Sequence, residues 1–166
     1  MHDSAYNWLA KMAAMLPPRQ RVVEFGSRNV NGTARPLFPL TCYVGIDRAP
    51  GPGVDVVCDA CMWCPPAGFE PFDTVICSET LEHAENAGDV CGNAYMTLAH
   101  GGVMLVTAAS TEREPHSAID GGPLQDGEFY RNVSAADLRK WLDRFGCVLI
   151  DESSPGDVYA LAVKTR

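Results

Sequence analysis

At 166 residues the chain has the size of one domain, so we expect a single domain spanning residues 1–166. Hydrophobic residues make up 46% and charged residues 20%, as in an ordinary globular protein, and the net charge of −8 argues against a surface that coats nucleic acid. No apolar run approaches the roughly 20 residues of a membrane span and no signal peptide is visible, so we expect no membrane contact.

The first half of the chain is predicted to contain one main helix and four strands. Ser4 can cap a helix that runs to about Leu16 and is stopped by two prolines. Pro36 and Pro39 leave room for only a short helix after the first strand. The predicted strands are apolar, and the last three end in an acidic residue or lead directly into one: Arg21–Phe25, Cys42–Asp47, Val54–Asp59 and Phe72–Ser78.

The second half is predicted to contain two helices, three strands and one long loop. A helix over about residues 87–99 ends at Gly101–Gly102, and a strand follows within Gly102–Ala108. Residues 109–133 read as a loop, and loops of this length are uncommon unless functional or disordered. Ser134 and Asp137 form a capping box for the last helix. The closing strands, Cys147–Asp151 and Val158–Lys164, are joined by a turn too short for a crossover and must be antiparallel.

The order of these elements predicts the fold class. Apolar strands without alternating polarity belong to a parallel sheet that is covered on both faces. We therefore expect an α/β fold with a doubly wound sheet of about seven strands, mostly parallel with an antiparallel last strand, and helices on both faces. Ligands of such sheets sit at the carboxyl ends of the strands.

The turn at Gly26 and Ser27, after the first strand, is the first candidate for ligand binding. A buried strand that runs into a turn of small residues is predicted to leave backbone N–H groups pointing into a crevice. Glu24 lies inside that strand, where an unpaired acid would be costly, and is best explained as an acceptor for backbone N–H groups or for a cationic ligand. The alternative is an ordinary strand end.

Two further acids at strand ends could bind a nucleoside. Asp47 follows the glycine turn by about 20 residues, and a carboxylate there can accept hydrogen bonds from both hydroxyls of a ribose. Asp59 could face an adenine amino group, with the backbone N–H of Ala60 beside it. Either acid could instead be a solvated loop residue. The chain has no GxGxxG, P-loop or Tyr-x-x-x-Lys pattern, so a dinucleotide or nucleotide-sugar oxidoreductase is a poor alternative.

The seven cysteines are odd in number and mostly lie inside predicted strands or helices, which favours reduced thiols in a cytoplasmic protein. Cys58, Cys61 and Cys64 are spaced like metal ligands. A structural zinc requires four ligands, however, and Cys77 or His83 could be the fourth only if the fold brings it close. We therefore predict no metal site.

Taken together, these segments resemble the class I S-adenosylmethionine-dependent methyltransferases of the compact, core-domain type. The resemblance extends from Val22 to about Lys164, and its most specific part is the strand that enters Ser-Glu-x-Leu-Glu-His. It rests on the segments VVEFGS, YVGID, VCDA, FDTVICSETLEHA and GGVMLVTAA. It implies a Rossmann-like fold and S-adenosyl-L-methionine as cofactor. The first motif departs from the family's ExGxGxG, because Ser27, Asn29 and Asn31 stand near expected glycines.

The resemblance also implies roles for individual residues. Glu24, Gly26 and Ser27 would contact the methionyl part of the cofactor, and Asp47 would hold its ribose. Arg48, Asp59 and Ala60 would lie at the adenine. The methyl-transfer side would be lined by Ser78, Glu79 and His83.

The predicted reaction needs few catalytic groups, because a sulfonium methyl is already electrophilic and in-line positioning supplies much of the rate. For an oxygen or nitrogen acceptor, a base adds about 10²–10⁴-fold. His83 and His116 are the candidates, and His116 is favoured because its loop, with Arg113, Asp120 and Tyr130, would arch over the site. Both histidines could equally be surface residues.

We therefore expect transfer of a methyl group to an oxygen or nitrogen of a small molecule or sugar, with no nucleic-acid partner. The alternative is a non-catalytic, methyltransferase-like module that binds a nucleoside or serves as a partner subunit. The altered first motif and the lack of an accessory domain motivate that alternative. The sequence does not indicate an oligomeric state.

Overall fold

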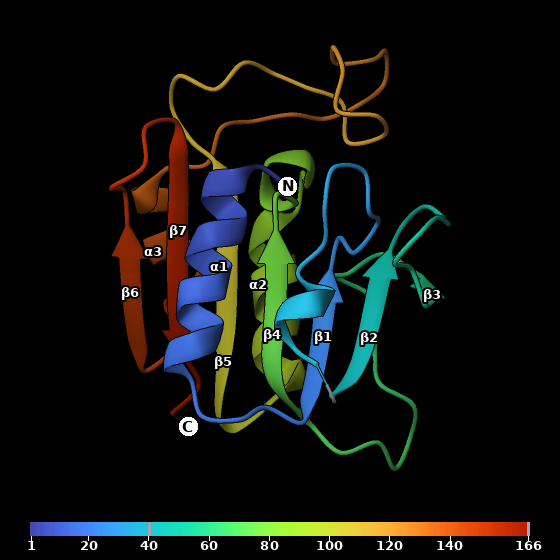
Figure 1. Cartoon of the computed structure of the whole chain (residues 1–166), viewed down its shortest axis with the longest axis vertical. Coiled ribbons are helices and arrows are strands. Elements are labelled where there is room, and N and C mark those ends of the chain that lie inside the picture. Colours follow the sequence, from blue (N-terminus) through green and yellow to red (C-terminus); the bar gives the residue numbers. More distant parts are fainter. Residues whose placement is uncertain (40, 166) are drawn as a thin grey trace.

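The computed structural model describes residues 1–39 and 41–165, and its centre is a sheet of seven strands in the order β3-β2-β1-β4-β5-β7-β6 (Figure 1). The strands are β1 (Arg21–Phe25), β2 (Cys42–Asp47), β3 (Val56–Val57), β4 (Phe72–Ser78), β5 (Leu98–Ala109), β6 (Cys147–Asp151) and β7 (Asp157–Val163). The helices are α1 (Asp3–Met15), α2 (Ala87–Thr97) and α3 (Ala135–Trp141), with the 3₁₀ turns η1 (Arg35–Leu37) and η2 (Leu81–His83).

The pairing of the strands confirms the predicted fold class. β1 lies between β2 and β4, and all neighbours from β3 to β5 run parallel. β7 is antiparallel to both β5 and β6. The closing pair is therefore the antiparallel hairpin that its short connection requires. The capping box of Ser134 and Asp137 at the start of α3 is also present.

Helices cover both faces of the sheet, because alternate residues of the central strands point to opposite sides. Val22 packs on the face covered by α1, where Trp8 and Leu9 are buried. Val23, one residue later, packs on the opposite face with Leu138 of α3 and residues of α2. In Figure 1 the helix α1 lies in front of the sheet, and α2 and α3 lie behind it. Strands buried on both sides explain the continuous apolar runs of the sequence.

The predicted boundaries were wrong in three places: at the start of α1, at both ends of β3, and where α2 meets β5. α1 begins at Asp3, and the hydroxyl of Ser4 donates to the carboxylate of Asp157 at 2.7 Å instead of capping the helix. β3 is limited to two residues, because only Val56 and Val57 pair with β2. α2 ends at Thr97, and β5 already begins at Leu98, which pairs with Phe72 before a bulge in the ladder.

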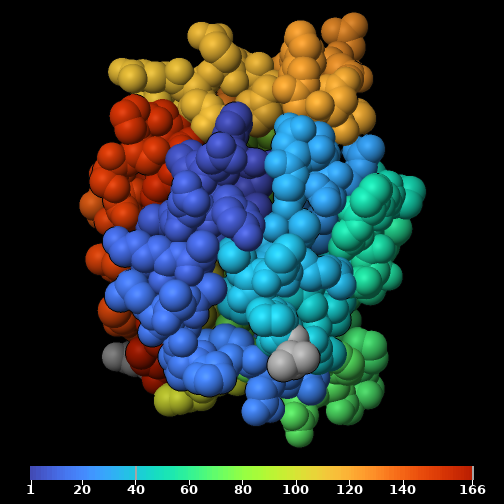
Figure 2. All heavy atoms as spheres, in the orientation of Figure 1, coloured from blue at the N-terminus to red at the C-terminus, as the bar shows by residue number. Residues whose placement is uncertain are grey.

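The segment from Ser110 to Ser134 connects β5 to α3 and forms the roof of the molecule. Figure 1 shows it above the carboxyl ends of the parallel strands, and Figure 2 shows it as a continuous layer across that end. An isolated bridge between His116 and Pro123 gives it local order. The prediction of a long loop here was correct, although Ala109 still belongs to β5. Among the described residues, no helix is long and apolar enough to cross a membrane.

Candidate functional site at the carboxyl ends of the strands

A cavity of about 540 Å³ lies between the carboxyl ends of the strands and the roof segment. Its walls come from the turn after β1, the ends of β2, β3 and β4, the η2 region and residues 112–121. All eleven residues given a role in the site line this cavity: Glu24, Gly26, Ser27, Asp47, Arg48, Asp59, Ala60, Ser78, Glu79, His83 and His116. The parallel sheet brings them together, because its strands end at one edge.

The turn at Gly26 is tight and packed from both sides. Gly26 adopts φ = 77°, and a Cβ atom there would lie 1.9 Å from the hydroxyl oxygen of Thr80. The backbone N–H groups of Gly26 and Ser27 donate to the carbonyl of Ile46 at 2.9 and 3.0 Å. The prediction that the N–H groups of this turn point into the crevice was therefore wrong for these two residues. They bind the neighbouring strand, because β2 continues past the end of β1.

Ser27 instead contributes its side chain. The residue is only 2% exposed and lines the cavity, yet its Oγ has no hydrogen-bond partner among the described residues. A buried hydroxyl without a partner is costly. Ser27 Oγ is therefore available to a polar group of a bound ligand.

The carboxylate of Asp47 is held by the backbone on both sides. Its Oδ2 accepts from the N–H of Arg28 at 3.1 Å, and its Oδ1 accepts from the N–H of Ala49 at 2.9 Å. Each oxygen retains a second lone pair. Asp47 is thus a fixed acceptor at the cavity wall rather than a freely solvated loop acid.

The wall next to Asp47 is formed by Asp59 and Arg48. Asp59 Oδ1 accepts from the N–H of Cys61 at 3.0 Å. Burial acts to raise the pKa of Asp59, but the hydrogen bonds from Cys61 outweigh it and the pKa is lowered. The guanidinium of Arg48 donates to the carbonyl of His83 at 3.4 Å. This bond links the β2 side of the cavity to the η2 side.

Glu24 is almost fully buried in β1, as its position in an apolar strand suggests. Its Oε2 accepts from the hydroxyl of Tyr43 at 2.9 Å, and it also interacts with the Ala34 backbone. Burial raises the pKa of Glu24 to about 7, although both hydrogen bonds act in the opposite direction. The sequence had indicated a backbone partner but not Tyr43, whose role depends on the β1–β2 register.

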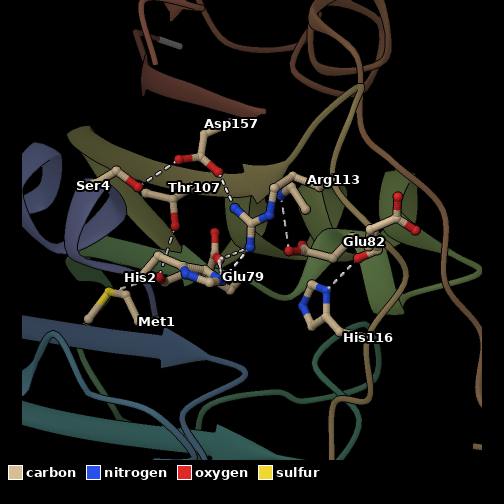
Figure 3. A network of polar contacts seen from close by, with 12 residues as sticks. Met1, His2, Ser4, Glu79, Glu82, Thr107, Arg113, His116 and Asp157 are labelled. Carbon is tan, nitrogen blue, oxygen red and sulfur yellow. Dashed lines mark hydrogen bonds and ion pairs between the residues drawn. The ribbon is translucent and has the colours of Figure 1, made fainter. Parts of the chain in front are cut away.

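A charged network borders the cavity where β4 ends (Figure 3). Glu79 follows β4 with φ = 49°, a backbone conformation that few residues other than glycine adopt. Its Oε2 lies 3.9 Å from the Arg113 guanidinium, which also binds Asp157 at 2.5 Å and contacts His2. Burial raises the pKa of Glu79, while Arg113 acts to lower it. Arg113 anchors the roof segment to β7, which no local sequence signal indicated.

His83 and His116 pack against each other and against Tyr130. The ring centroids lie 5.0 Å apart for the two histidines, 5.4 Å for His83 with Tyr130 and 5.0 Å for His116 with Tyr130. Burial, helped by the neighbouring His116, lowers the pKa of His83 to about 4. His83 is not a surface residue, because it is only 7% exposed, whereas His116 is half-buried.

Glu82 lies within the Ser-Glu-x-Leu-Glu-His segment but received no role from the sequence. It is fully buried, and its Oε1 accepts from the N–H of Ala109 at 3.0 Å. Its carbonyl accepts from the N–H of Arg131 at 2.8 Å. Burial raises its pKa to about 8, and the nearby Glu79 acts in the same direction. The only signal in the sequence was an acid placed three residues after Glu79.

The cysteines Cys58, Cys61 and Cys64 have different surroundings and do not share a partner. Cys58 Sγ contacts the carbonyl of Asp59 at 3.5 Å, Cys61 Sγ accepts from Asn86 at 2.8 Å, and Cys64 is exposed. Within residues 1–39 and 41–165, no cluster with the spacing of metal ligands includes them.

Comparison with known proteins identifies the family. A family model described as a methyltransferase domain matches residues 2–152, whereas no curated protein matches the chain. Among solved structures, the N-methyltransferase NodS from Bradyrhizobium japonicum WM9, in complex with S-adenosyl-L-homocysteine, is similar with a TM-score of 0.69 and 12% identity. That match covers 98% of this chain and 87% of NodS.

Two further structures have bound cofactor or product. The 1,6-didemethyltoxoflavin-N1-methyltransferase from Burkholderia thailandensis has a TM-score of 0.68 and 15% identity, over 99% of this chain and 80% of that one. CalS10, an amino pentose methyltransferase from Micromonospora echinaspora, has a TM-score of 0.68 and 16% identity, over 99% and 91%. With the match of the family model, the chain is a member of the methyltransferase-domain family, an S-adenosylmethionine-dependent methyltransferase with a Rossmann-like fold.

Proposed function

We propose that this enzyme transfers the methyl group of S-adenosylmethionine to an oxygen or nitrogen atom of a small-molecule or sugar acceptor. The observation that carries the proposal is a cavity lined both by the strand-end acids Glu24, Asp47 and Asp59 and by the histidines His83 and His116. Two of the similar structures, the 1,6-didemethyltoxoflavin-N1-methyltransferase and the amino pentose methyltransferase, support the acceptor class.

The residues of the cavity fit the cofactor. Ser27 Oγ has no partner within the part of the chain that the structure describes, and Glu24 presents a buried carboxyl to the cavity where a cationic amino group would bind. Asp47 would accept the ribose hydroxyls with the lone pairs that Arg28 and Ala49 leave free. Asp59, Ala60 and Arg48 would surround the adenine, and Ser78 would line the methyl-transfer side.

S-adenosylmethionine would supply an electrophilic methyl group on a sulfonium. The protein's contribution is to orient the acceptor, exclude water and accept a proton. His116 Nδ1 lies 3.2 Å from the carbonyl of Glu114, which favours a proton on Nδ1 and a free lone pair on Nε2. His83 is uncharged at neutral pH, because its pKa is about 4. His116 could therefore accept a proton from the acceptor through Nε2, worth about 10²–10⁴-fold in rate, whereas the low pKa makes His83 the weaker base.

We further propose that residues 1–166 form one methyltransferase domain that works in the cytoplasm without a nucleic-acid partner. All seven cysteines are free, which suits a reducing compartment. The net charge of −8 disfavours binding to a phosphate backbone.

The cofactor site is tested by calorimetry with S-adenosylhomocysteine. We expect Asp47→Asn to weaken binding at least tenfold, because an amide nitrogen would face the backbone N–H groups or the ribose. Asp55→Asn is the matched control: Asp55 also accepts a backbone N–H, from Gly45 at 2.7 Å, but does not line the cavity. No binding by the wild type at millimolar ligand, or equal losses in both variants, would contradict the proposed site.

The acceptor class is tested with methyl-labelled S-adenosylmethionine and a cell extract separated into small-molecule, RNA and protein fractions. We expect label in the small-molecule fraction. Label confined to RNA or protein would overturn the proposed acceptor.

A further inference from the structure

One group of side chains at the rim of the cavity has the composition and spacing of a metal site. Glu82, His83 and His116 each place a ligand atom within 4.8 Å of the other two, and within the described part of the chain no other group of three does so. Glu82 and His83 come from η2, and His116 comes from the roof segment. Figure 3 shows the Glu82 and His116 side chains next to each other, beside Arg113.

Two of these three residues have a buried polar atom that no described group satisfies. Glu82 Oε2 and His83 Nδ1 have no hydrogen-bond partner among residues 1–39 and 41–165, and Glu82 is fully buried. A buried carboxylate oxygen or imidazole nitrogen without a partner costs several times the worth of an ordinary hydrogen bond. The hydroxyl of Tyr130, whose ring contacts both histidines, also has no hydrogen-bond partner among the residues that the structure describes. An additional ligand at this position would satisfy these atoms.

The remaining polar atoms of the three residues are held by the backbone. Glu82 Oε1 accepts from the N–H of Ala109, and the His83 ring makes a hydrogen bond to the backbone of Phe129. His116 Nδ1 lies within hydrogen-bond distance of the Glu114 carbonyl, at 3.2 Å. Backbone contacts of this kind orient the imidazoles and carboxylates of metal sites and leave the opposite atom for the ion. Each residue therefore has one supported atom and one available atom.

Nearby positive charge does not occupy the site. Arg113 is bound by Asp157 and lies beside Glu79, and the Met1 ammonium interacts electrostatically with Glu79 and Glu82. Glu79 and Glu82 lie close enough to interact electrostatically. A divalent cation at this position would pair with the carboxylate of Glu82.

We propose that Glu82, His83 and His116 bind a divalent transition-metal ion at the acceptor end of the cavity. Two imidazoles and one carboxylate suit Mn²⁺, Fe²⁺, Co²⁺ or Zn²⁺, whereas Mg²⁺ and Ca²⁺ prefer oxygen ligands alone. Three protein ligands leave coordination positions open. His83 and His116 line the cavity, so these positions face it.

The open positions also indicate a class of acceptor, a step that rests on the proposed function. A bound ion attracts an oxygen of the acceptor and makes a hydroxyl there easier to deprotonate. An acceptor that bears a hydroxyl, or two neighbouring hydroxyls, fits such a site. His83 and His116 would then hold the ion, and the proton released from the hydroxyl would pass to solvent water.

The test is direct binding of Co²⁺ to chelator-treated protein without cofactor, followed by the visible absorption of the ion and reversed by Zn²⁺. We expect one ion per chain, with no sulfur-to-cobalt charge-transfer band. Such a band would mean that the cysteines bind the ion and would overturn the proposal. Failure to bind Co²⁺ or Zn²⁺ at millimolar concentration would also overturn it.

The ligands are tested with His116→Ala, which changes a half-buried loop residue, and with His100→Ala as the control at an exposed position of β5. We expect Co²⁺ affinity to fall at least tenfold in the first variant and to stay unchanged in the second. Equal affinities in the two variants would refute the assignment.

A second measurement uses the wild type alone, so it does not depend on the folding of a variant. Mn²⁺ at substoichiometric amounts should broaden the imidazole NMR signals of His83 and His116 but not those of His100. Equal broadening of all three would contradict the site. Because binding is measured without S-adenosylmethionine, failure of the methyl-transfer assay would leave this result standing, and the reverse also holds.

Discussion

The hydroxyl of Tyr43 on β2 donates a hydrogen bond of 2.9 Å to the carboxyl of Glu24 on the adjacent strand β1. The parallel register, in which Val22 lies opposite Tyr43 and Glu24 opposite Gly45, determines this pairing. The bond gives one oxygen of this buried carboxyl a hydrogen-bond partner, which replaces the water that burial removes. It does not fully compensate for that burial, since the pKa of Glu24 is still raised to about 7.

Glu24 should make the stability of the protein depend on pH. Its pKa is about 7 in the folded protein and 4.5 in the unfolded chain, so the folded state binds the extra proton between these values. The contribution of Glu24 is therefore most favourable below pH 4.5 and declines as the pH rises through 7. Between pH 5 and pH 8, we expect wild type to lose on the order of 2 kcal/mol more unfolding free energy than Glu24→Gln, measured by urea denaturation.

The comparison with Glu24→Gln isolates Glu24 from other groups that titrate in this range. The glutamine retains the shape and an acceptor oxygen for Tyr43 but does not ionise. Parallel pH profiles for the two proteins would contradict the raised pKa.

Gly26→Ala should disrupt the turn after β1 more than a positive φ alone would. The added Cβ would lie 1.9 Å from Thr80 Oγ1, so the turn or Thr80 must move. We expect affinity for S-adenosylhomocysteine to fall at least tenfold, about 1.4 kcal/mol, measured by calorimetry. Gly68→Ala is the control, because Gly68 has φ = 84° but a Cβ added there would meet nothing within 4 Å, and the residue lies outside the cavity.

Both variants carry the strain of a left-handed alanine, about 1–2 kcal/mol. The predicted difference in their affinity for S-adenosylhomocysteine therefore reports the packing of the turn after β1 against Thr80 and the cofactor. Equal affinities for S-adenosylhomocysteine would show that the turn does not position the cofactor.

Arg113→Gln should loosen the roof segment while leaving the sheet folded. Arg113 is the cation that joins this segment to Asp157, at 2.5 Å, and to Glu79. Asp157 retains the hydroxyls of Ser4, Ser154 and Tyr159 as donors, so the carboxylate is not left unpaired. We expect faster hydrogen exchange over residues 112–131 and a loss of about 1–3 kcal/mol in the free energy of unfolding.

Arg131→Gln provides the matched comparison within the same segment. Arg131 pairs with Asp137 at 3.2 Å, but the Arg131 side chain is 50% exposed, so the pair is worth less than about 1 kcal/mol. If both variants exchange equally fast, the Arg113–Asp157 pair does not hold the roof.

Several features of the fold followed from local patterns in the sequence. Pro17 and Pro18 ended α1, the Ser134–Asp137 box started α3, and the short connection before β7 made the last strand pair antiparallel. The boundaries that failed were those decided by contacts distant in sequence. Leu98 joined β5 because it pairs with Phe72, although its local context favoured the helix.

The same division applies to the site. Glu24, Asp47 and Asp59 could be assigned to one cavity from sequence, because the carboxyl ends of parallel strands must meet at one edge. The direction of the N–H groups at Gly26 could not be predicted from the sequence, since it depends on the carbonyl of Ile46 in the next strand. Likewise, Tyr43 became the partner of Glu24 only through the register of β1 and β2.

The sequence by itself thus determined the class of fold, the family and the strand-end residues that meet at the cavity. These depend on periodicity, turn chemistry and short motifs, which act over a few neighbouring residues. Only the tertiary structure decided that Glu82, His83 and His116 converge, and that Arg113 ties the roof to β7. Those contacts join residues far apart in the chain, and the packing of the roof segment over the sheet sets them.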